Sequence, residues 1–224
     1  MSEFTDEVTE IGVGSSYGNG WRQLKRNFWV LLIITIIVLL ISSPSEIMGD
    51  IAEKSDSGFF GLLALVYGIL VTGPIYLGAS FVYLKAARDD SPQIMDAFEG
   101  FRDYWNVVLA NFLVWLIIVV GFLLFIVPGI IFGCKLAFTP FLVVDRKMRA
   151  GDAIKESWRL TKGRALTVFL IGLLTIPIAI AGLICLGVGI IVSIMWIGLA
   201  FASLYYAVIS SDKGGEPDTS STQC

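Results

Sequence analysis

The chain has no histidine, only three cysteines and few charged side chains for its length. Without histidine it lacks the commonest general base and the commonest metal ligand of proteins. Cys134, Cys185 and Cys224 form no C-x-x-C pair, and Cys224 is the last residue, so a prenylation box is absent. Walker A, HExxH and GxSxG sequences are also missing. We therefore expect no metal, no cofactor and no enzymatic activity.

Charged residues make up 16% of the chain, against about 25% in a typical soluble domain, and 56% of the residues are hydrophobic. The apolar residues fall into long blocks, which is typical of helices that cross a lipid bilayer. No basic tract or aromatic–basic array suggests binding of nucleic acid. The pattern predicts an all-α integral membrane protein. Its spans are predicted over residues 28–42, 59–84, 106–126, 128–144, 165–186 and 190–210.

Lysine and arginine are unevenly distributed between the segments that connect these spans. The segment before the first span, the segment between the second and third, and the segment between the fourth and fifth are all basic, whereas the opposite side has only Lys54. By the positive-inside rule, the spans form three hairpins with both termini in the cytoplasm. Residues 1–20 and 211–224 are then predicted to be flexible cytoplasmic tails, and we expect the prokaryotic cell membrane as the location.

Two connecting segments have the pattern of short amphipathic helices on the cytoplasmic side. One follows Pro92 and leads into Trp105, and the other covers residues 152–162. Aromatic and basic residues at the membrane entry points predict interfacial anchors: Trp21, Arg22, Phe101, Arg102, Trp158, Arg159 and Lys162. The basic segment from Arg146 to Arg164 predicts attraction to anionic lipids of the inner leaflet, or alternatively a docking surface for a cytoplasmic partner.

Proline and serine predict where the first two spans are interrupted. Ser43-Pro44-Ser45-Glu46 has the form of a capping box with proline at the first helical position, so we expect the first span to end at Ser42. A loop containing a short helix would then occupy residues 43–58. Gly73-Pro74 predicts a kink in the second span, and Pro128-Gly129 predicts the turn between the third and fourth.

Lys135 is the ionisable residue that the sequence places well inside a span. A lysine at mid-span costs about 2.5–3.5 kcal/mol on insertion scales, so it calls for an explanation. Its side chain can snorkel toward the outer headgroups, because helix side chains lean toward the helix amino terminus. Alternatively, it binds an anionic lipid or substrate in a pocket with Tyr67 and Thr175, which the sequence places at similar depth.

Small residues recur at a spacing that allows close helix packing. Gly129 and Gly133 have the GxxxG spacing, and Gly198 with Ala202 has the related small-xxx-small form. These residues serve packing within the bundle or a contact between copies of the chain.

Several motifs together carry a resemblance to a known group. They are Gly73-Pro74-Ile75-Tyr76-Leu77-Gly78, Ala97 to Phe101, Pro128-Gly129-Ile130, Thr139-Pro140, Asp145, Asp152-Ala153 and Ser157 to Gly163. Over roughly residues 20–210 the chain resembles a prokaryotic family of six-span membrane proteins of unknown function. That family is similar to the membrane domain of glycerophosphoryl diester phosphodiesterases. The resemblance implies a fold and no activity, since the phosphodiesterase chemistry belongs to a separate soluble domain.

Two functions remain open from the sequence. The spans contain few polar groups, which favours a non-enzymatic accessory or scaffold subunit with a membrane protein partner, or a homo-oligomer. The alternative is a carrier or channel for a lipid or small anionic solute, with a pocket around Lys135.

Overall fold

The computed structural model describes residues 12–55, 58–184 and 188–214. Within these ranges the chain is helical and contains no strand. Among the described residues, six helical stretches are long and apolar enough to cross a membrane: Phe28–Ser55, Gly58–Ala87, Tyr104–Leu124, Val127–Asp145, Ala165–Ile184 and Gly189–Asp212. The predicted all-α class and the six candidate spans are thereby confirmed.

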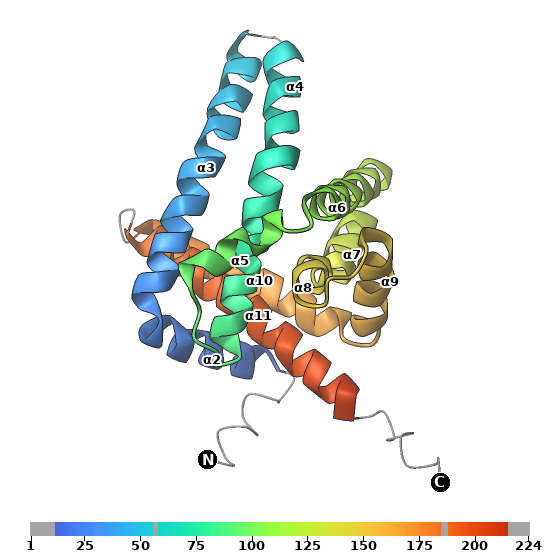
Figure 1. Ribbon diagram of the computed structural model, residues 1–224. Coiled ribbons are helices and arrows are strands. Elements are labelled where there is room, and N and C mark those ends of the chain that lie inside the picture. Colours follow the sequence, from blue (N-terminus) through green and yellow to red (C-terminus); the bar gives the residue numbers. More distant parts are fainter. Residues whose placement is uncertain (1–11, 56–57, 185–187, 215–224) are drawn as a thin grey trace.

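The helices are arranged around α5 and α11, which pack against each other (Figure 1). In chain order the described elements are α2 (Val13–Arg26), α3 (Phe28–Ser55), α4 (Gly58–Tyr67), the π-helical turn η1 (Gly68–Thr72), α5 (Gly73–Ala87), the 3-10 helix η2 (Ile94–Phe101), α6 (Tyr104–Leu124), α7 (Ile126–Leu136), α8 (Thr139–Asp145), α9 (Ala150–Leu160), α10 (Ala165–Ile184) and α11 (Val188–Gly214). Figure 1 shows α3 and α4 side by side, rising away from the rest, while α2 and the end of α11 lie at the opposite end. Helices α6 to α9 form a group on one side of α5.

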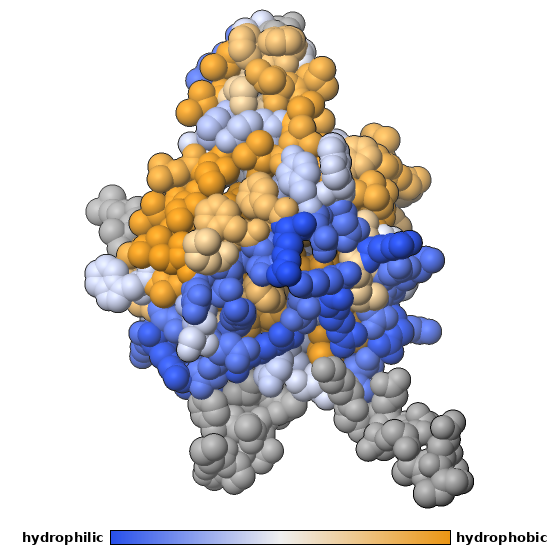
Figure 2. All heavy atoms as spheres, in the orientation of Figure 1, coloured by the Kyte–Doolittle hydropathy of each residue, from blue (hydrophilic) through white to orange (hydrophobic). Residues whose placement is uncertain are grey.

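Apolar and polar side chains separate along the molecule. In Figure 2 hydrophobic residues cover the upper part, and hydrophilic residues gather in a broad band over the lower part. Many large apolar side chains are exposed on the spans, among them Trp29, Leu40, Phe59, Leu123 and Ile184. An exposed apolar surface of this extent is stable in lipid and not in water.

Helix α2 replaces much of the predicted amino-terminal tail. Residues 13–20 are helical, because α2 packs along α11 and buries Tyr17 and Asn19. The indole nitrogen of Trp196 donates to the Tyr17 carbonyl at 2.9 Å, and the Asn19 amide donates to the Ser203 hydroxyl at 3.0 Å. Residues 1–11 lie outside the described part of the chain. At the other end, α11 continues past the predicted boundary to Gly214, and residues 215–224 are outside the described part.

The first span does not end at Ser42. Helix α3 continues through Pro44 to Ser55, so the predicted capping box at Ser43 does not start a new helix. Proline lacks an N–H and leaves the carbonyl four residues earlier without its helical donor. Here the Ser43 hydroxyl donates to that carbonyl, Leu40, at 2.9 Å. The helix therefore tolerates Pro44, and most of the predicted loop is helical.

In the second span, Pro74 also leaves a carbonyl without its helical donor, and here a residue of another helix supplies the hydrogen bond. Pro74 cannot donate to the carbonyl of Leu70, and the hydroxyl of Tyr104 on α6 donates to it at 2.9 Å. The π-helical turn η1 lies directly before Gly73-Pro74, where the sequence predicts a kink. A π-helical turn of this kind changes helix direction without breaking it.

The first of the two predicted amphipathic α-helices is a 3-10 helix, η2, packed tightly on α5. A Cβ atom at Gly78 would lie 1.7 Å from the carbonyl oxygen of Ala97, and one at Gly100 would lie 2.1 Å from that of Pro74. Ala97 and Gly100 are buried, whereas Met95, Phe98 and Phe101 are exposed. The Gln93 backbone N–H donates to the Asp96 carboxylate at 2.8 Å, so Gln93 caps this helix.

The third and fourth spans meet at Phe125, which has an extended backbone between α6 and α7. The reversal thus precedes the predicted turn at Pro128-Gly129, and Pro128 lies in the first turn of α7, where no N–H is needed. The fourth span is also not one continuous helix. It divides into α7 and α8 before Pro140, which cannot donate to the Leu136 carbonyl.

Candidate ligand cavity between the spans

A cavity of about 460 Å³ lies where α3, α5, α6, α7, α8 and α11 converge. Ligand cavities in proteins measure about 300–1,000 Å³ and are lined mainly by apolar side chains. This lining is largely apolar too, with Val38, Leu77 and Ile197 among its members. None of the described residues that line it is a lysine, arginine, aspartate or glutamate. The cavity is therefore suited to an uncharged, mostly apolar molecule.

Two glycines, one on α7 and one on α11, leave part of this space open. A Cβ atom at Gly133 on α7 would have no neighbour within 4 Å, and one at Gly198 on α11 would lie 3.0 Å from the Tyr83 ring. Both residues line the cavity. A side chain at Gly133 can thus enter the cavity without displacing the surrounding helices.

Thr139 is a buried cavity residue whose hydroxyl has no partner among the described residues. The residue is only 1% exposed. A threonine in a helix ordinarily donates to the carbonyl four residues earlier, which here belongs to Lys135. That carbonyl instead accepts from the Ser157 hydroxyl at 2.7 Å and from Thr161 at 3.4 Å, because the chain divides into α7 and α8 at this point. An unpartnered buried hydroxyl is rare and costs about 1–3 kcal/mol.

Asn111 brings a carboxamide into the same lining from the middle of α6. Its amide nitrogen lies against the start of α5, 2.5 Å from the position that a Cβ atom on Gly73 would occupy. Within the described ranges the Asn111 side chain makes no hydrogen bond. Tyr76 is 58% exposed although it lines the cavity, so its phenol is accessible as well.

The remaining polar groups of the lining are satisfied within the protein. The Thr35 hydroxyl lies 2.9 Å from that of Tyr83 and donates to the Leu31 carbonyl at 2.8 Å. The Ser80 hydroxyl donates to the Tyr76 carbonyl at 2.9 Å. Thr139, Asn111 and the Tyr76 hydroxyl are therefore the groups with hydrogen-bonding capacity to offer a ligand.

The ion pair of Arg88 and Asp145 lies beyond the cavity, toward the polar end of the molecule. Phe141 lines the cavity and stacks on Tyr205, with ring centroids 5.1 Å apart. One turn further along α8, Asp145 accepts two hydrogen bonds from Arg88, at 2.6 and 2.7 Å, and a third from the Tyr205 hydroxyl at 3.1 Å. Burial lowers the pKa of Arg88, but its hydrogen bonds and charge interaction with Asp145 outweigh this effect and raise the pKa above its ordinary value. The pair joins α5, α8 and α11 at this end of the cavity.

The structure does not bring Lys135, Tyr67 and Thr175 together in one pocket, and none of them lines the cavity. The Tyr67 hydroxyl donates to the Ile41 carbonyl at 3.0 Å. The Thr175 hydroxyl donates to the Ile171 carbonyl at 3.1 Å. Lys135 lies in the last turn of α7, and its ammonium nitrogen is 4.0 Å from the centre of the Trp158 ring on α9. The lysine thus finds a partner that neither sequence interpretation named.

We expect replacement of Lys135 with methionine to cost at most about 1–2 kcal/mol of stability, the range of a partly desolvated cation–π contact. Methionine keeps the apolar stem against the Trp158 ring and removes the charge. Binding of a cavity ligand should not change, because Lys135 does not line the cavity. Thermal unfolding in detergent and a ligand-binding measurement on the same variant check both statements. Loss of ligand binding with unchanged stability would restore Lys135 as a site residue.

The small residues predicted to pack helices have separate roles. A Cβ atom at Gly129 would lie 2.7 Å from the Phe122 ring, so this glycine allows α6 and α7 to approach closely. Ala202 is fully buried within the bundle. Gly133 and Gly198 line the cavity. All four residues thus face neighbouring helices or the cavity within this chain.

The predicted interfacial anchors lie in three places: on α2, at the end of η2 and at the end of α9. Trp21 stacks at a tilt on Trp196, with centroids 5.0 Å apart, and Phe101 stacks on Tyr104 at 6.3 Å. Arg102 pairs with Glu99 at 3.3 Å, and Lys162 is exposed. Arg22, on α2, has a partner as well. Trp21, Phe101 and Arg102 are thus each held by a neighbouring side chain.

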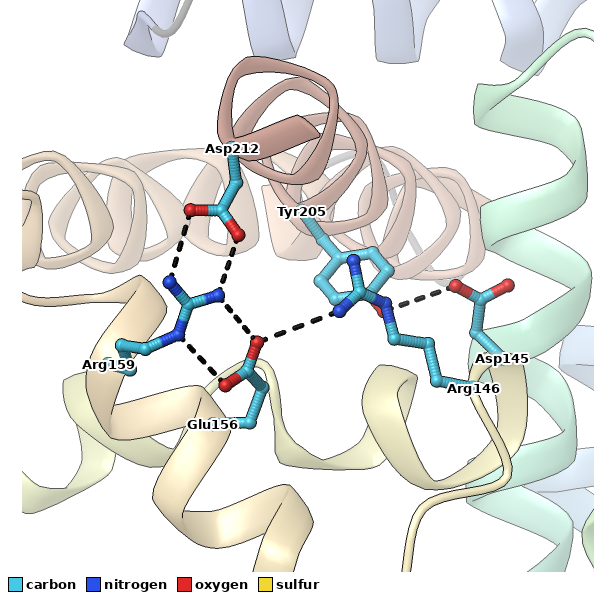
Figure 3. Close-up of polar contacts among 6 residues, drawn as sticks. All are labelled: Asp145, Arg146, Glu156, Arg159, Tyr205 and Asp212. Carbon is cyan, nitrogen blue, oxygen red and sulfur yellow. Dashed lines mark hydrogen bonds and ion pairs between the residues drawn. The ribbon is translucent and has the colours of Figure 1, made fainter. Parts of the chain in front are cut away.

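Arg159 is the centre of a second charge network, shown in Figure 3. Its guanidinium donates to Glu156 at 2.8 and 2.9 Å and to Asp212 at 2.6 and 3.3 Å, which joins α9 to the end of α11. Arg146 adds a longer contact to Glu156 at 3.6 Å. The hydrogen bonds from Arg159 lower the pKa of Glu156, and those to Glu156 and Asp212 raise the pKa of Arg159. Sequence reasoning missed this network because Asp212 stands in the predicted tail.

Comparison with protein families, with curated proteins and with solved structures finds no match to this chain. Among the described residues, no group of three or more His, Cys, Asp or Glu side chains could hold a metal ion.

Proposed function

We propose that the protein is a multi-pass membrane protein that binds the apolar chain of a lipid-like molecule in the cavity between its spans, without catalysing a reaction on it. The observation that carries the proposal is the cavity of about 460 Å³, which has an apolar lining and unpartnered hydrogen-bonding groups. This volume admits about fifteen water-sized groups at about 30 Å³ each, which is enough for a large part of one acyl chain. Lipid binding was one of the two functions left open by the sequence, which placed the pocket around Lys135. Here the binding site is the cavity, which Lys135 does not line.

Filling the cavity tests this function. Gly133→Leu is expected to reduce the amount of bound lipid about ten-fold, because the new side chain occupies space that the ligand needs. Gly172→Leu is the matched control, since a Cβ atom at Gly172 also has no neighbour within 4 Å but the residue does not line the cavity. Native mass spectrometry of the protein released from bilayer nanodiscs counts the lipids retained. Equal retention by the two variants would exclude the cavity as the binding site.

A second candidate function, an accessory subunit of a membrane complex, is favoured by α4. This helix has no buried residue, and it rises with the distal part of α3 away from the other helices (Figure 1). Such an exposed pair of helices offers a surface to another membrane protein. Stable co-purification with one defined protein in mild detergent, lost when Leu62 is replaced with tryptophan, would favour this function. Recovery of a monomer that binds lipid would favour the first.

We also propose that the six spans form three hairpins with both termini in the cytoplasm, and that the basic segments bind anionic lipids there. The asymmetry of lysine and arginine supports this orientation. The hydrophilic band around α2 and the end of α11 agrees with it (Figure 2). The resemblance to a prokaryotic six-span family is retained as part of the proposal, and with it a location in the cell membrane.

Labelling of single cysteines tests the orientation. In a chain whose native cysteines are replaced with alanine, Lys54→Cys is expected to react with an impermeant maleimide in intact cells. Lys162→Cys should react only after the membrane is permeabilised. Both lysines are exposed in the structure, so protection reflects the membrane and not burial in the protein. Reaction of Lys162→Cys in intact cells would reverse the proposed orientation.

A further inference from the structure

We propose that the Asn111 carboxamide and the Thr139 hydroxyl bind the polar group of the cavity ligand, and that this ligand is an uncharged acyl ester. The inference rests on the proposed function, because it names the chemical class of the molecule that the same cavity holds. It predicts a ligand with one carbonyl acceptor and a hydroxyl group beside it, attached to an apolar chain.

Asn111 lies in the middle of the apolar helix α6. A carboxamide at such a position is costly unless its donors and acceptor are satisfied. Asn111 lies in the cavity lining, and the described residues provide no hydrogen bond to its side chain. A carboxamide offers two N–H donors and one carbonyl acceptor. An ester carbonyl can accept from its amide, and a hydroxyl on the ligand can donate to its oxygen.

Thr139 lines the cavity from α8. Its usual acceptor, the Lys135 carbonyl, is already used by Ser157 and Thr161 on the other side. The hydroxyl therefore has no partner within the described protein. Two unpartnered polar residues in one apolar lining are better explained by a polar group of the ligand than by a pure hydrocarbon.

The described lining of the cavity carries no charged side chain. An anionic group in this cavity would have no cation to compensate the loss of water, and a buried unpaired charge is strongly disfavoured. Arg88, beyond the lining, donates two hydrogen bonds to Asp145, and this carboxylate compensates its charge. Only its Nε lacks a partner among the described residues. An uncharged ester is therefore favoured over a carboxylate or a phosphate.

Photocrosslinking in bilayer nanodiscs tests this inference on the full chain. The probes are monooleoylglycerol, octadecene and oleate, each with a diazirine in its apolar chain. The readout is the yield of adducts on peptides that line the cavity. We expect monooleoylglycerol to label these peptides more than oleate does. Asn111→Leu is expected to reduce its labelling about ten-fold, and Thr139→Val about five-fold, since both replacements keep the size of the side chain. Octadecene labelling should stay within about two-fold in both variants.

The controls separate the inference from the function on which it rests. Thr175→Val removes a hydroxyl that is already satisfied by the Ile171 carbonyl outside the cavity, and it should leave all labelling unchanged. If wild-type protein is labelled by monooleoylglycerol and octadecene but Asn111→Leu and Thr139→Val change neither, the inference is wrong and the proposed function stands. If oleate labels the lining best, the ligand class is wrong. If no probe labels the lining, the proposed function fails and the inference fails with it.

Discussion

Replacing Gly78 with alanine is expected to prevent stable folding, with a loss of about 3 kcal/mol or more. In a helix this change ordinarily stabilises by about 1 kcal/mol, because alanine has the better helix propensity. Here the new methyl group would lie 1.7 Å from the Ala97 carbonyl oxygen and 2.6 Å from its carbon. Both atoms belong to the backbone of η2, so they cannot rotate away as a side chain would. Helix α5 and η2 must separate, and the buried contacts around Ala97 are lost.

Thermal unfolding in detergent and the yield of folded protein measure this effect. Gly172→Ala is the matched control, because it has the same propensity gain and no neighbour within 4 Å of the added methyl group. We expect the control to unfold at or slightly above the wild-type temperature. A Gly78→Ala variant that unfolds at the wild-type temperature would show that η2 does not pack on α5 as described.

The second large effect concerns the ion pair of Arg88 and Asp145. Replacing Arg88 with methionine is expected to cost about 2–3 kcal/mol, somewhat less than for a fully buried pair. The cost is lower because the side chains of Arg88 and Asp145 are 23% and 12% exposed to solvent, which screens their interaction. The cost arises because the Asp145 carboxylate loses the guanidinium beside it and two of its three hydrogen bonds. The Tyr205 hydroxyl alone does not compensate a carboxylate at this depth.

A double-mutant cycle isolates the pair from the other contacts of Arg88, including its position over the Tyr206 ring. The double variant Arg88→Met with Asp145→Leu should be more stable than the sum of the two single losses predicts, by about 2 kcal/mol. The exposed pair of Arg102 and Glu99 is the comparison, and Arg102→Met should cost under about 1 kcal/mol. Additive losses at Arg88 and Asp145 would mean that the two side chains do not interact in the folded protein.

The sequence predicts the six candidate spans well, because long apolar blocks are the strongest signal a chain carries. Its errors lie where a side-chain hydrogen bond or packing against another helix decides the local structure. Helix α3 continues through Pro44, because the neighbouring Ser43 hydroxyl donates to the Leu40 carbonyl. The kink before Pro74 was predicted, but the hydrogen bond from Tyr104 of α6 to the Leu70 carbonyl was not. The sequence of α2 resembles that of a polar tail, so the helix was not predicted. Its stability comes from packing on α11, which the local sequence does not show.

The candidate site was less predictable for a related reason. A lone lysine in a span attracts attention, whereas a threonine in a span ordinarily satisfies itself on its own helix. What distinguishes Thr139 is the division between α7 and α8, and the proline at position 140 is the one sequence signal for it. Asn111 could have been found as the carboxamide that lies deeper in the third span than Asn106. Which spans surround it depends on the three-dimensional packing alone.

The most direct test of the cavity is a crystal structure of the protein grown from phospholipid bicelles to which monooleoylglycerol has been added. We expect continuous elongated electron density between α3, α5, α6, α7, α8 and α11, with its polar end within hydrogen-bonding distance of Asn111 or Thr139. A cavity closed by its own side chains, or one that contains only ordered water, would contradict the account.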